Sequence, residues 1–306
     1  MKFQKVEHIT NSNIELIVDT GKGWKIIENS TGNILDYLGL SDVEMNSKKL
    51  LPYDEANYKS ILPVKPVAYR DFILYEQHML NAAKGFVKKY MPKIFPVVKV
   101  YETLFGKPFP MTKPHPRWYK YPIYYLGNHL NFFSEGYEIK IPEYTKELDY
   151  ELELGVILSK PLLNAKPEEV NDAIGGFVIL NDFSARDQQM EEIKAGFGIM
   201  KTKNFGSTIS ATVVSASELL SKIDDLKVKV FVNNDLIVEG STGNKKFSLQ
   251  EAIAFASWEE QLHPGELFGS GTIPGCCGME NGRLLNVGDS ICLEVEGIGK
   301  LTNYVI

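Results

Sequence analysis

The chain has 306 residues, 44% of them hydrophobic and 24% charged, which is ordinary for a globular protein with an ample core. Its formal net charge of −6 argues against nucleic acid or an anionic membrane as the main partner, and no apolar run reaches the roughly 18 residues of a transmembrane helix. The three cysteines make no disulfide framework and the N-terminal residues contain no apolar signal segment, so we expect a cytoplasmic protein.

Residues 1–65 predict a small β-rich N-terminal domain. Two short strand segments, 15–19 and 23–27, flank a glycine-containing turn. An acidic helical segment is expected around 41–51, and the proline-flanked stretch 63–66 marks the predicted boundary. Nothing in this part of the chain forms a catalytic constellation.

Residues 69–89 have the apolar spacing of one amphipathic helix with few breakers. Asp71 and His78 are seven residues apart, so in such a helix they share a face and lie roughly 10 Å apart along the axis. Two simpler roles stay open. Asp71 suits the positive end of a helix dipole, and His78 could be a partly buried polar residue with a backbone partner.

Residues 91–122 are rich in proline, lysine and aromatic residues. This segment is too long for a tight connection, so we expect a loop with short helical pieces that arches over a site. Residues 121–128 then predict a strand that leads into a turn, with tyrosines that either line a pocket or belong to the core.

Residues 149–158 alternate acidic and apolar side chains before becoming wholly apolar, which predicts a β-strand. Glu151 and Glu153 then project from one face about 7 Å apart, while Leu152 and Leu154 point into a core. Two neighbouring carboxylates repel each other unless a cation lies between them, and a hard divalent ion with oxygen ligands would serve. A solvated polar face is the alternative.

Residues 175–180 predict a buried strand that ends at Asp182, a common position for a ligand or a catalytic acid. Ser184 is expected to cap the helix that follows, on which Arg186 and Gln189 share a face. Lys203 lies close to a glycine that would let the backbone approach a ligand.

The remaining residues predict further strands and one helix. A hairpin is expected over 226–232 and 236–238, a helix over 247–261, and a last hairpin over 290–295 and 300–305. The glycine-rich turn 269–275 is not a phosphate-binding loop, because no Gly-Lys-Ser/Thr follows it. Cys276 and Cys277 after this turn are expected to be buried structural thiols.

Five segments, in order, resemble motifs of the fumarylacetoacetate hydrolase family: 151–153, 181–187, 203–206, 269–272 and 297–303. The resemblance extends from about residue 66 to residue 306. It implies an α+β, mainly β fold, a mixed β-roll over residues 66–306 that forms the catalytic domain. It also implies one Mg²⁺, Ca²⁺ or Mn²⁺, with Mg²⁺ the first choice, and a homodimer.

The resemblance assigns the metal site by position. The Glu-x-Glu pair of the family falls on Glu151 and Glu153, and its later aspartate falls on Asp182. The hydrolase branch adds an Asp-Phe motif with a Gln-His pair that ends seven residues after the aspartate, which falls on Asp71 and His78. Asp71 would be the fourth metal ligand, and four oxygen donors suit a hard cation.

The same resemblance assigns catalytic and substrate-binding roles. His78 would activate water, Glu280 would orient it, and Lys203 would lie next to the metal. Gln189, Arg186 and Thr272 would contact the substrate. The chain departs from the fumarylacetoacetate enzyme in having Ile73 in place of a substrate tyrosine and Val87, followed by Lys88 and Lys89, in place of a carboxylate-binding arginine.

These assignments predict metal-dependent hydrolysis of a carbon–carbon bond in a 1,3-diketo acid, with a small-molecule substrate of the fumarylacetoacetate or acylpyruvate type. The metal would act as a Lewis acid, and His78 would remove a proton from the attacking water. Decarboxylation or tautomerisation of an oxo-diacid is a second hypothesis, which needs the metal but no attack by water. A non-catalytic, metal-stabilised protein is the third.

Overall fold

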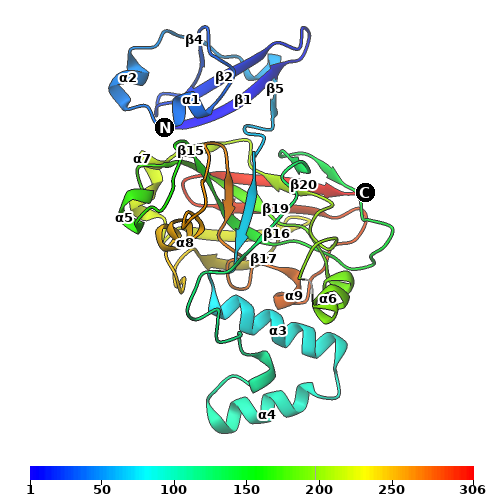
Figure 1. The fold of residues 1–306 in the computed structure, drawn as a ribbon. Helices are drawn as coiled ribbons and strands as arrows, with labels where there is room; N and C mark the ends of the chain where they lie inside the picture. The colour runs from blue at the N-terminus through cyan, green and yellow to red at the C-terminus, as the bar shows by residue number, and fades with distance from the viewer. Residues whose placement is uncertain (197) are drawn as a thin grey trace.

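A large strand-rich body dominates the computed structural model, which describes residues 1–196 and 198–306 (Figure 1). Within those residues one sheet of 13 strands follows the order β4-β3-β2-β1-β15-β12-β11-β18-β6-β7, with β5, β8 and β14 attached at its sides. Its strands are β1 Lys2–His8, β2 Ile14–Asp19, β3 Trp24–Ile27, β4 Leu50–Pro52, β5 Tyr58–Ile61, β6 Tyr69–Phe72, β7 Tyr124–Leu126, β8 Phe132–Phe133, β11 Leu152–Leu158, β12 Ile174–Asn181, β14 Ser207–Ile209, β15 Val213–Ser215 and β18 Leu267–Gly269.

A second sheet packs against this one across the main core. Its strands are β9 Glu138–Ile139, β16 Lys227–Val232, β17 Asp235–Ser241, β19 Ser290–Val295 and β20 Gly299–Val305. A two-stranded ribbon of β10 Leu148–Asp149 and β13 Ser184–Ala185 completes the strands. The predicted α+β, mainly β fold is confirmed, and so are the two hairpins of this sheet, β16–β17 and β19–β20.

Nine α-helices and three short 3₁₀ turns are described in residues 1–196 and 198–306. They are α1 Leu35–Leu38, α2 Asp42–Asn46, α3 Glu76–Tyr90, α4 Phe95–Phe105, α5 Pro167–Val170, α6 Arg186–Ala195, α7 Ala216–Leu219, α8 Leu249–Ala256 and α9 Gly278–Asn281, with 3₁₀ turns η1 Glu55–Asn57, η2 Pro110–Thr112 and η3 Leu220–Lys222. Helices α1 and α2 lie in the N-terminal lobe (Figure 1). In the described part of the chain, none of the helices has the length and apolarity needed to cross a bilayer.

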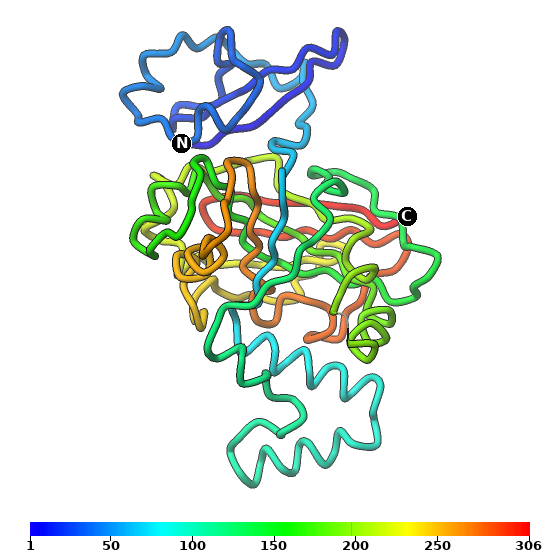
Figure 2. Tube along the Cα trace, in the orientation of Figure 1, coloured from blue at the N-terminus to red at the C-terminus, as the bar shows by residue number. Residues whose placement is uncertain are grey.

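The N-terminal strands form a lobe at one end of the molecule (Figure 2). The predicted hairpin is present, since β2 and β3 pair antiparallel with Asp19 opposite Trp24. The acidic helix is shorter than expected, because α2 is followed by strand β4. Strand β1 also pairs with β15, so the lobe continues the large sheet. The domain boundary at residue 65 stays a prediction.

The single helix expected over 69–89 is wrong. Residues Tyr69–Phe72 form β6, which lies parallel to β18 and antiparallel to β7, and α3 begins only at Glu76. Pairing with strands distant in sequence overrides the local helical pattern. Asp71 therefore lies in a sheet, neither on the helix of His78 nor at its start.

The segment 91–122 is more helical than expected, since α4 alone has 11 residues. Together α3 and α4 project from the body at the end opposite the N-terminal lobe (Figure 2). The returning chain is fastened by Trp118, which is fully buried and donates a hydrogen bond from Nε1 to the carbonyl oxygen of Ile73, 2.6 Å away. The indole thus ties the end of this projection to the chain just after β6.

Two local predictions in the second half of the chain need correction. Helix α8 is shorter than the predicted 247–261 and is closed by a capping box of Ser248 and Glu251. Ser184 does not cap α6, because its hydroxyl donates to the carbonyl oxygen of Asp182 and the N-cap position is Ala185.

Candidate metal centre and active site

Three buried carboxylates converge where strands of the large sheet meet. Asp71 lies on β6, Glu153 on β11 and Asp182 directly after β12, and one oxygen of each lies within 4.8 Å of the others. Strand β18 separates β6 from β11 and carries Gly269 opposite Asp71. A Cβ at Gly269 would overlap Asp71 Oδ1 and come 2.6 Å from Glu153 Oε2. Only glycine leaves room for this carboxylate cluster.

The carboxylate cluster has the chemistry of a hard cation site. Asp71 Oδ1 is buried and has no hydrogen-bond partner in the described part of the chain. Burial and the neighbouring Asp182 raise the pKa of Asp71 to about 8. Burial and the neighbouring acids also raise the pKa of Glu153. Oxygen donors held this close repel one another without a cation, and they suit Mg²⁺, Ca²⁺ and Mn²⁺ alike.

Glu151 lies beside this cluster and is neutralised by two cations. Lys203 Nζ lies 2.5 Å from Glu151 Oε2 and from Asp182 Oδ2, and Arg186 Nη2 donates to Glu151 Oε1 over 2.6 Å. Burial opposes ionisation of Glu151, but Lys203, Arg186 and then His78 lower its pKa below the usual range. The structure thus gathers three of the four expected acids and joins the fourth to them through Lys203.

Arg186, Gln189 and Thr272 are the residues expected to bind substrate, and all three are buried. Arg186 is buried, with Nε on Asp149 at 2.7 Å and Nη1 on Gln189 Oε1 at 2.8 Å, in addition to its bond to Glu151. Each of the three guanidinium nitrogens of Arg186 thus donates to a side chain of the protein, and these bonds position Glu151 and Gln189. Thr272 is buried on the turn after β18.

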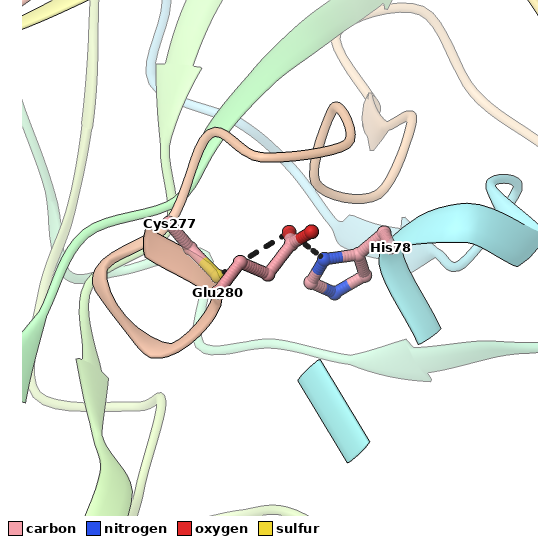
Figure 3. A group of neighbouring side chains, drawn as sticks. All are labelled: His78, Cys277 and Glu280. Atoms are coloured by element: carbon pink, nitrogen blue, oxygen red, sulfur yellow. Dashed lines mark hydrogen bonds and ion pairs between the residues drawn. The ribbon is translucent and has the colours of Figure 1, made fainter. Parts of the chain in front are cut away.

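The expected partner of His78 is also close. His78 Nδ1, on α3, lies 2.6 Å from Glu280 Oε1, on α9 (Figure 3). Glu280 Oε2 accepts hydrogen bonds from Asn81 Nδ2 at 2.9 Å and from the backbone N–H of Gly275 at 2.8 Å. With Nδ1 donating to Glu280, the other ring nitrogen, Nε2, carries the lone pair that can accept a proton.

This pair depends on a close contact between helices that the sequence analysis missed. A Cβ at Gly85 of α3 would overlap the carbonyl oxygen of Met279 in α9 and lie 3.1 Å from its carbonyl carbon. Glycine therefore lets α3 approach α9 until His78 reaches Glu280. The only signal in the sequence is a glycine inside a helical pattern.

Two tyrosines complete the surroundings of the carboxylate cluster. Tyr125 on β7 donates a hydrogen bond to Asp182 Oδ2 over 2.8 Å. The Tyr69 hydroxyl is buried and, among the described residues, has no hydrogen-bond partner. Tyr69 and Asp71 are two residues apart on β6, so they project from the same face. Because residues 69–89 were expected to form one helix, the sequence did not predict that Tyr69 and Asp71 lie on the same face of a strand.

A cavity of about 700 Å³ opens beside Glu280, between α3, the start of α4 and the chain around α9. Four cations line it: Lys84, Lys88, Lys89 and Arg283. Glu280 is the only acid on its wall as far as the structure describes it. Lys84, Lys89 and Arg283 each form an ion pair with an acid that does not line the cavity, so Lys88 is the cation left unpaired within the described residues.

The family profile described as fumarylacetoacetate (FAA) hydrolase C-terminal matches residues 99–306. An uncharacterised protein of Methanocaldococcus jannaschii is 33% identical over 189 residues, which cover 61% of this chain and 73% of that protein. The mitochondrial oxaloacetate tautomerase fahd2 of Xenopus laevis is 31% identical over 169 residues, 55% of this chain and 53% of the tautomerase.

The bifunctional isomerase/decarboxylase of homoprotocatechuate catabolism from Escherichia coli is 27% identical over 236 residues, 69% of this chain and 52% of that protein. The chain thus spans about half the length of these two named relatives.

Solved structures share the fold over the whole chain. The fumarylacetoacetate hydrolase of Exiguobacterium antarcticum superposes with a TM-score of 0.73 at 21% identity, covering 100% of this chain and 99% of that one. The 5-carboxymethyl-2-hydroxymuconate delta-isomerase of Mycobacterium smegmatis gives 0.71 at 18% identity, with coverage of 100% and 99%. At these identities the likeness concerns the fold alone.

Proposed function

The chain belongs to the fumarylacetoacetate hydrolase family, and from this premise we propose that it is a metal-dependent hydrolase that cleaves a carbon–carbon bond in a 1,3-diketo acid. The observation that carries the proposal is the His78–Glu280 pair, because Glu280 accepts from Nδ1 in the tautomer that has its lone pair on Nε2. Glu151 lies beside the carboxylate cluster, where burial opposes its ionisation but the cations Lys203 and Arg186 lower its pKa, so it is ionised there.

Asp71, Glu153 and Asp182 would hold the cation, with Glu151 proposed as the fourth ligand. A divalent cation bound there would act as a Lewis acid on the oxygens of the diketo acid. Its identity stays a proposal, with Mg²⁺ the first choice and Ca²⁺ or Mn²⁺ as the alternatives. The homodimer expected from the family resemblance also stays a prediction.

The chain's own residues supply the proton transfers. His78 Nε2 takes a proton from water, whose oxygen forms a bond to the carbonyl carbon, while Glu280 stabilises the imidazolium through Nδ1. When the carbon–carbon bond breaks, the departing carbon receives a proton from His78. Lys203 stays protonated because Asp182 and Glu151 raise its pKa against the effect of burial, so it can stabilise negative charge on the leaving group.

The cations that line the cavity beside Glu280 support an acidic substrate. Lys88 is the most available of them, because it is exposed and forms no ion pair within the described residues. A substrate carboxylate would enter through this positive field.

Tautomerisation or decarboxylation of an oxo-diacid is the second candidate. The names of two relatives favour it, since one is an oxaloacetate tautomerase and the other an isomerase/decarboxylase. Such reactions need the Lewis acid and a proton acceptor but no attacking water. The two candidates therefore differ in whether water is consumed.

The test is an ultraviolet absorbance assay with acylpyruvates, fumarylacetoacetate-like diketones and oxaloacetate, in Mg²⁺ or Mn²⁺ and in EDTA. We expect hydrolysis that EDTA abolishes and that His78→Ala lowers by about 10²- to 10⁴-fold. His115→Ala, at an exposed histidine, is the control and should keep full activity. Full acylpyruvate turnover by His78→Ala would refute the water-activation mechanism, and turnover of oxaloacetate alone would favour the second candidate.

A further inference from the structure

His78, Glu280 and Cys277 bring three different donor atoms together outside the carboxylate cluster (Figure 3). An imidazole nitrogen, a thiol sulfur and a carboxylate oxygen all lie within 4.8 Å of one another. Both neighbours approach the same oxygen, because Glu280 Oε1 is 2.6 Å from His78 Nδ1 and 3.5 Å from Cys277 Sγ. The thiol and the imidazole thus face a single carboxylate oxygen from two sides.

The surroundings hold these donors in place. Glu280 Oε2 is fixed by the backbone N–H of Gly275 and by Asn81, which leaves Oε1 directed at the other two groups. Cys277 is the N-cap residue of α9, one turn before Glu280, and is fully buried. Hydrogen bonds of this kind to a carboxylate orient it as a ligand and are typical of the second shell of metal sites.

We propose that His78, Cys277 and Glu280 form a second metal site that binds a thiophilic divalent ion, Zn²⁺ in particular. Imidazole, thiolate and carboxylate are the ligand types of zinc, whereas the all-oxygen carboxylate cluster suits harder ions. The two sites would therefore select different metals in one protein. This site does not depend on the proposed function.

The distances allow such a site after a small movement. Usual zinc bond lengths place tetrahedral ligand atoms about 3.4–3.6 Å apart. The separation of 3.5 Å between Cys277 Sγ and Glu280 Oε1 already agrees with this value. The His78 Nδ1–Glu280 Oε1 distance of 2.6 Å must open by about 0.8 Å, which a rotation of the imidazole provides. The side chain of His78 is 12% exposed, so the ion can enter from the imidazole side.

Binding would exchange protons for the metal ion. The thiol of Cys277 loses its proton to solvent, and the ion takes the lone pair of His78 Nδ1, so the imidazole proton moves to Nε2. Nε2 can then no longer accept a proton from water. If the proposed hydrolase mechanism holds, zinc inhibits the enzyme by fixing the wrong tautomer of its base.

Cobalt(II) in place of zinc tests the site directly. The full chain is titrated with Co²⁺ in excess Mg²⁺, which keeps the carboxylate cluster filled, and the thiolate-to-cobalt charge-transfer absorption is recorded in the near ultraviolet. We expect this band in the wild type and none in Cys277→Ser. The matched control is Cys276→Ala, because the Sγ of Cys276 contacts the carbonyl of Pro274 and lies in the main core. This control should keep the band.

Zinc inhibition provides the second readout. Cys277→Ser should keep the Mg²⁺-dependent activity and should need at least about 100-fold more Zn²⁺ for half inhibition, since loss of second-shell contacts alone costs 10- to 100-fold. If this variant unfolds, Cys277→Ala replaces it. A wild type without the charge-transfer band, or an equal band in Cys277→Ser, overturns the site. A band without zinc inhibition supports the site and counts against the hydrolase mechanism instead.

Discussion

The carboxylates Asp71, Glu153 and Asp182 lie on or directly after strands of one sheet, whereas His78 and Glu280 meet across a contact between two helices. The strands are fixed by hydrogen bonds along their length, but the charges that they bring together repel one another. The helices bring together groups that attract each other, but their spacing depends on one glycine. The first region is therefore sensitive to charge, and the second to geometry.

Glu153→Gln should have the largest effect. It separates the metal-binding role of the carboxylate cluster from the repulsion between its charges. The amide keeps an acceptor for the backbone N–H of Gly271, which now donates to Glu153 Oε2 over 3.0 Å. Loss of a metal ligand should lower kcat/KM by about 10³-fold, since Lewis-acid assistance is worth several kcal/mol. In EDTA the same change should raise the Tm, because it removes one of three crowded acids. A lower Tm in EDTA would contradict the repulsion argument.

Gly85→Ala would break the helix contact without touching a charge. Alanine favours a helix over glycine by about 0.5–1 kcal/mol, so propensity alone predicts a more stable protein. We expect the opposite, because the new Cβ overlaps the Met279 carbonyl. Pushing α3 away from α9 should lower kcat by about 10²-fold. Thermal unfolding and steady-state kinetics measure both effects, and Ala82→Ser on the same helix is the control. Unchanged kcat would show that this contact does not position His78.

The metal-free protein should become less stable as the pH rises. Burial, with Asp182 next to it, raises the pKa of Asp71 to about 8, against about 3.9 in an unfolded chain. Between these values the unfolded chain loses its proton and the folded one must keep it, so the free energy of unfolding falls from about pH 4 to pH 8. Denaturant unfolding in EDTA at pH 5 and pH 8 measures this fall.

A bound divalent ion should offset the fall in the free energy of unfolding at high pH. A divalent ion at 100 times its Kd adds about 2.7 kcal/mol to the free energy of unfolding. The gain should be larger at pH 8 than at pH 5, because protons compete for the same oxygens. Equal stability at both values in EDTA would mean that Asp71 is ionised in the metal-free fold.

Lys88→Met should have the smallest effect. This exposed lysine lines the cavity beside Glu280, and one such charge is worth up to about 1 kcal/mol to an anionic ligand. We expect KM for a diketo acid to rise about fivefold, with kcat unchanged and the difference reduced in high salt. Lys48→Met, at an exposed lysine of the N-terminal lobe, should leave KM unaltered.

Two acids of the carboxylate cluster could be predicted from the sequence. The alternation of acidic and apolar residues along a strand, and the end of an apolar run, are both local signals. Glu153 and Asp182 lie where a period of two and the end of an apolar run predict them. The local pattern places Asp71 on a helix, but its strand β6 forms by pairing with β7 and with β18, the latter nearly 200 residues later. The family resemblance is the source of its proposed role as a metal ligand, and only the fold shows its place in the sheet.

The helix contact could not be derived from the sequence. Nothing local indicates that Gly85 meets Met279 or that Asn81 and Gly275 hold Glu280. The thiol of Cys277 has no motif at all, and it was expected to be only structural. Its position beside His78 depends on the docking of α3 on α9, which is a property of the tertiary structure.

The buried Trp118 provides the molecule with an internal optical reporter. Its indole is fully buried at the junction between the helical projection and the end of β6, whereas Trp258 is 65% exposed on the body. Soluble quenchers would silence the emission of Trp258 and leave that of Trp118. With half-buried Trp24 of β3 replaced by phenylalanine, the remaining fluorescence would report on the junction between the projection and the sheet.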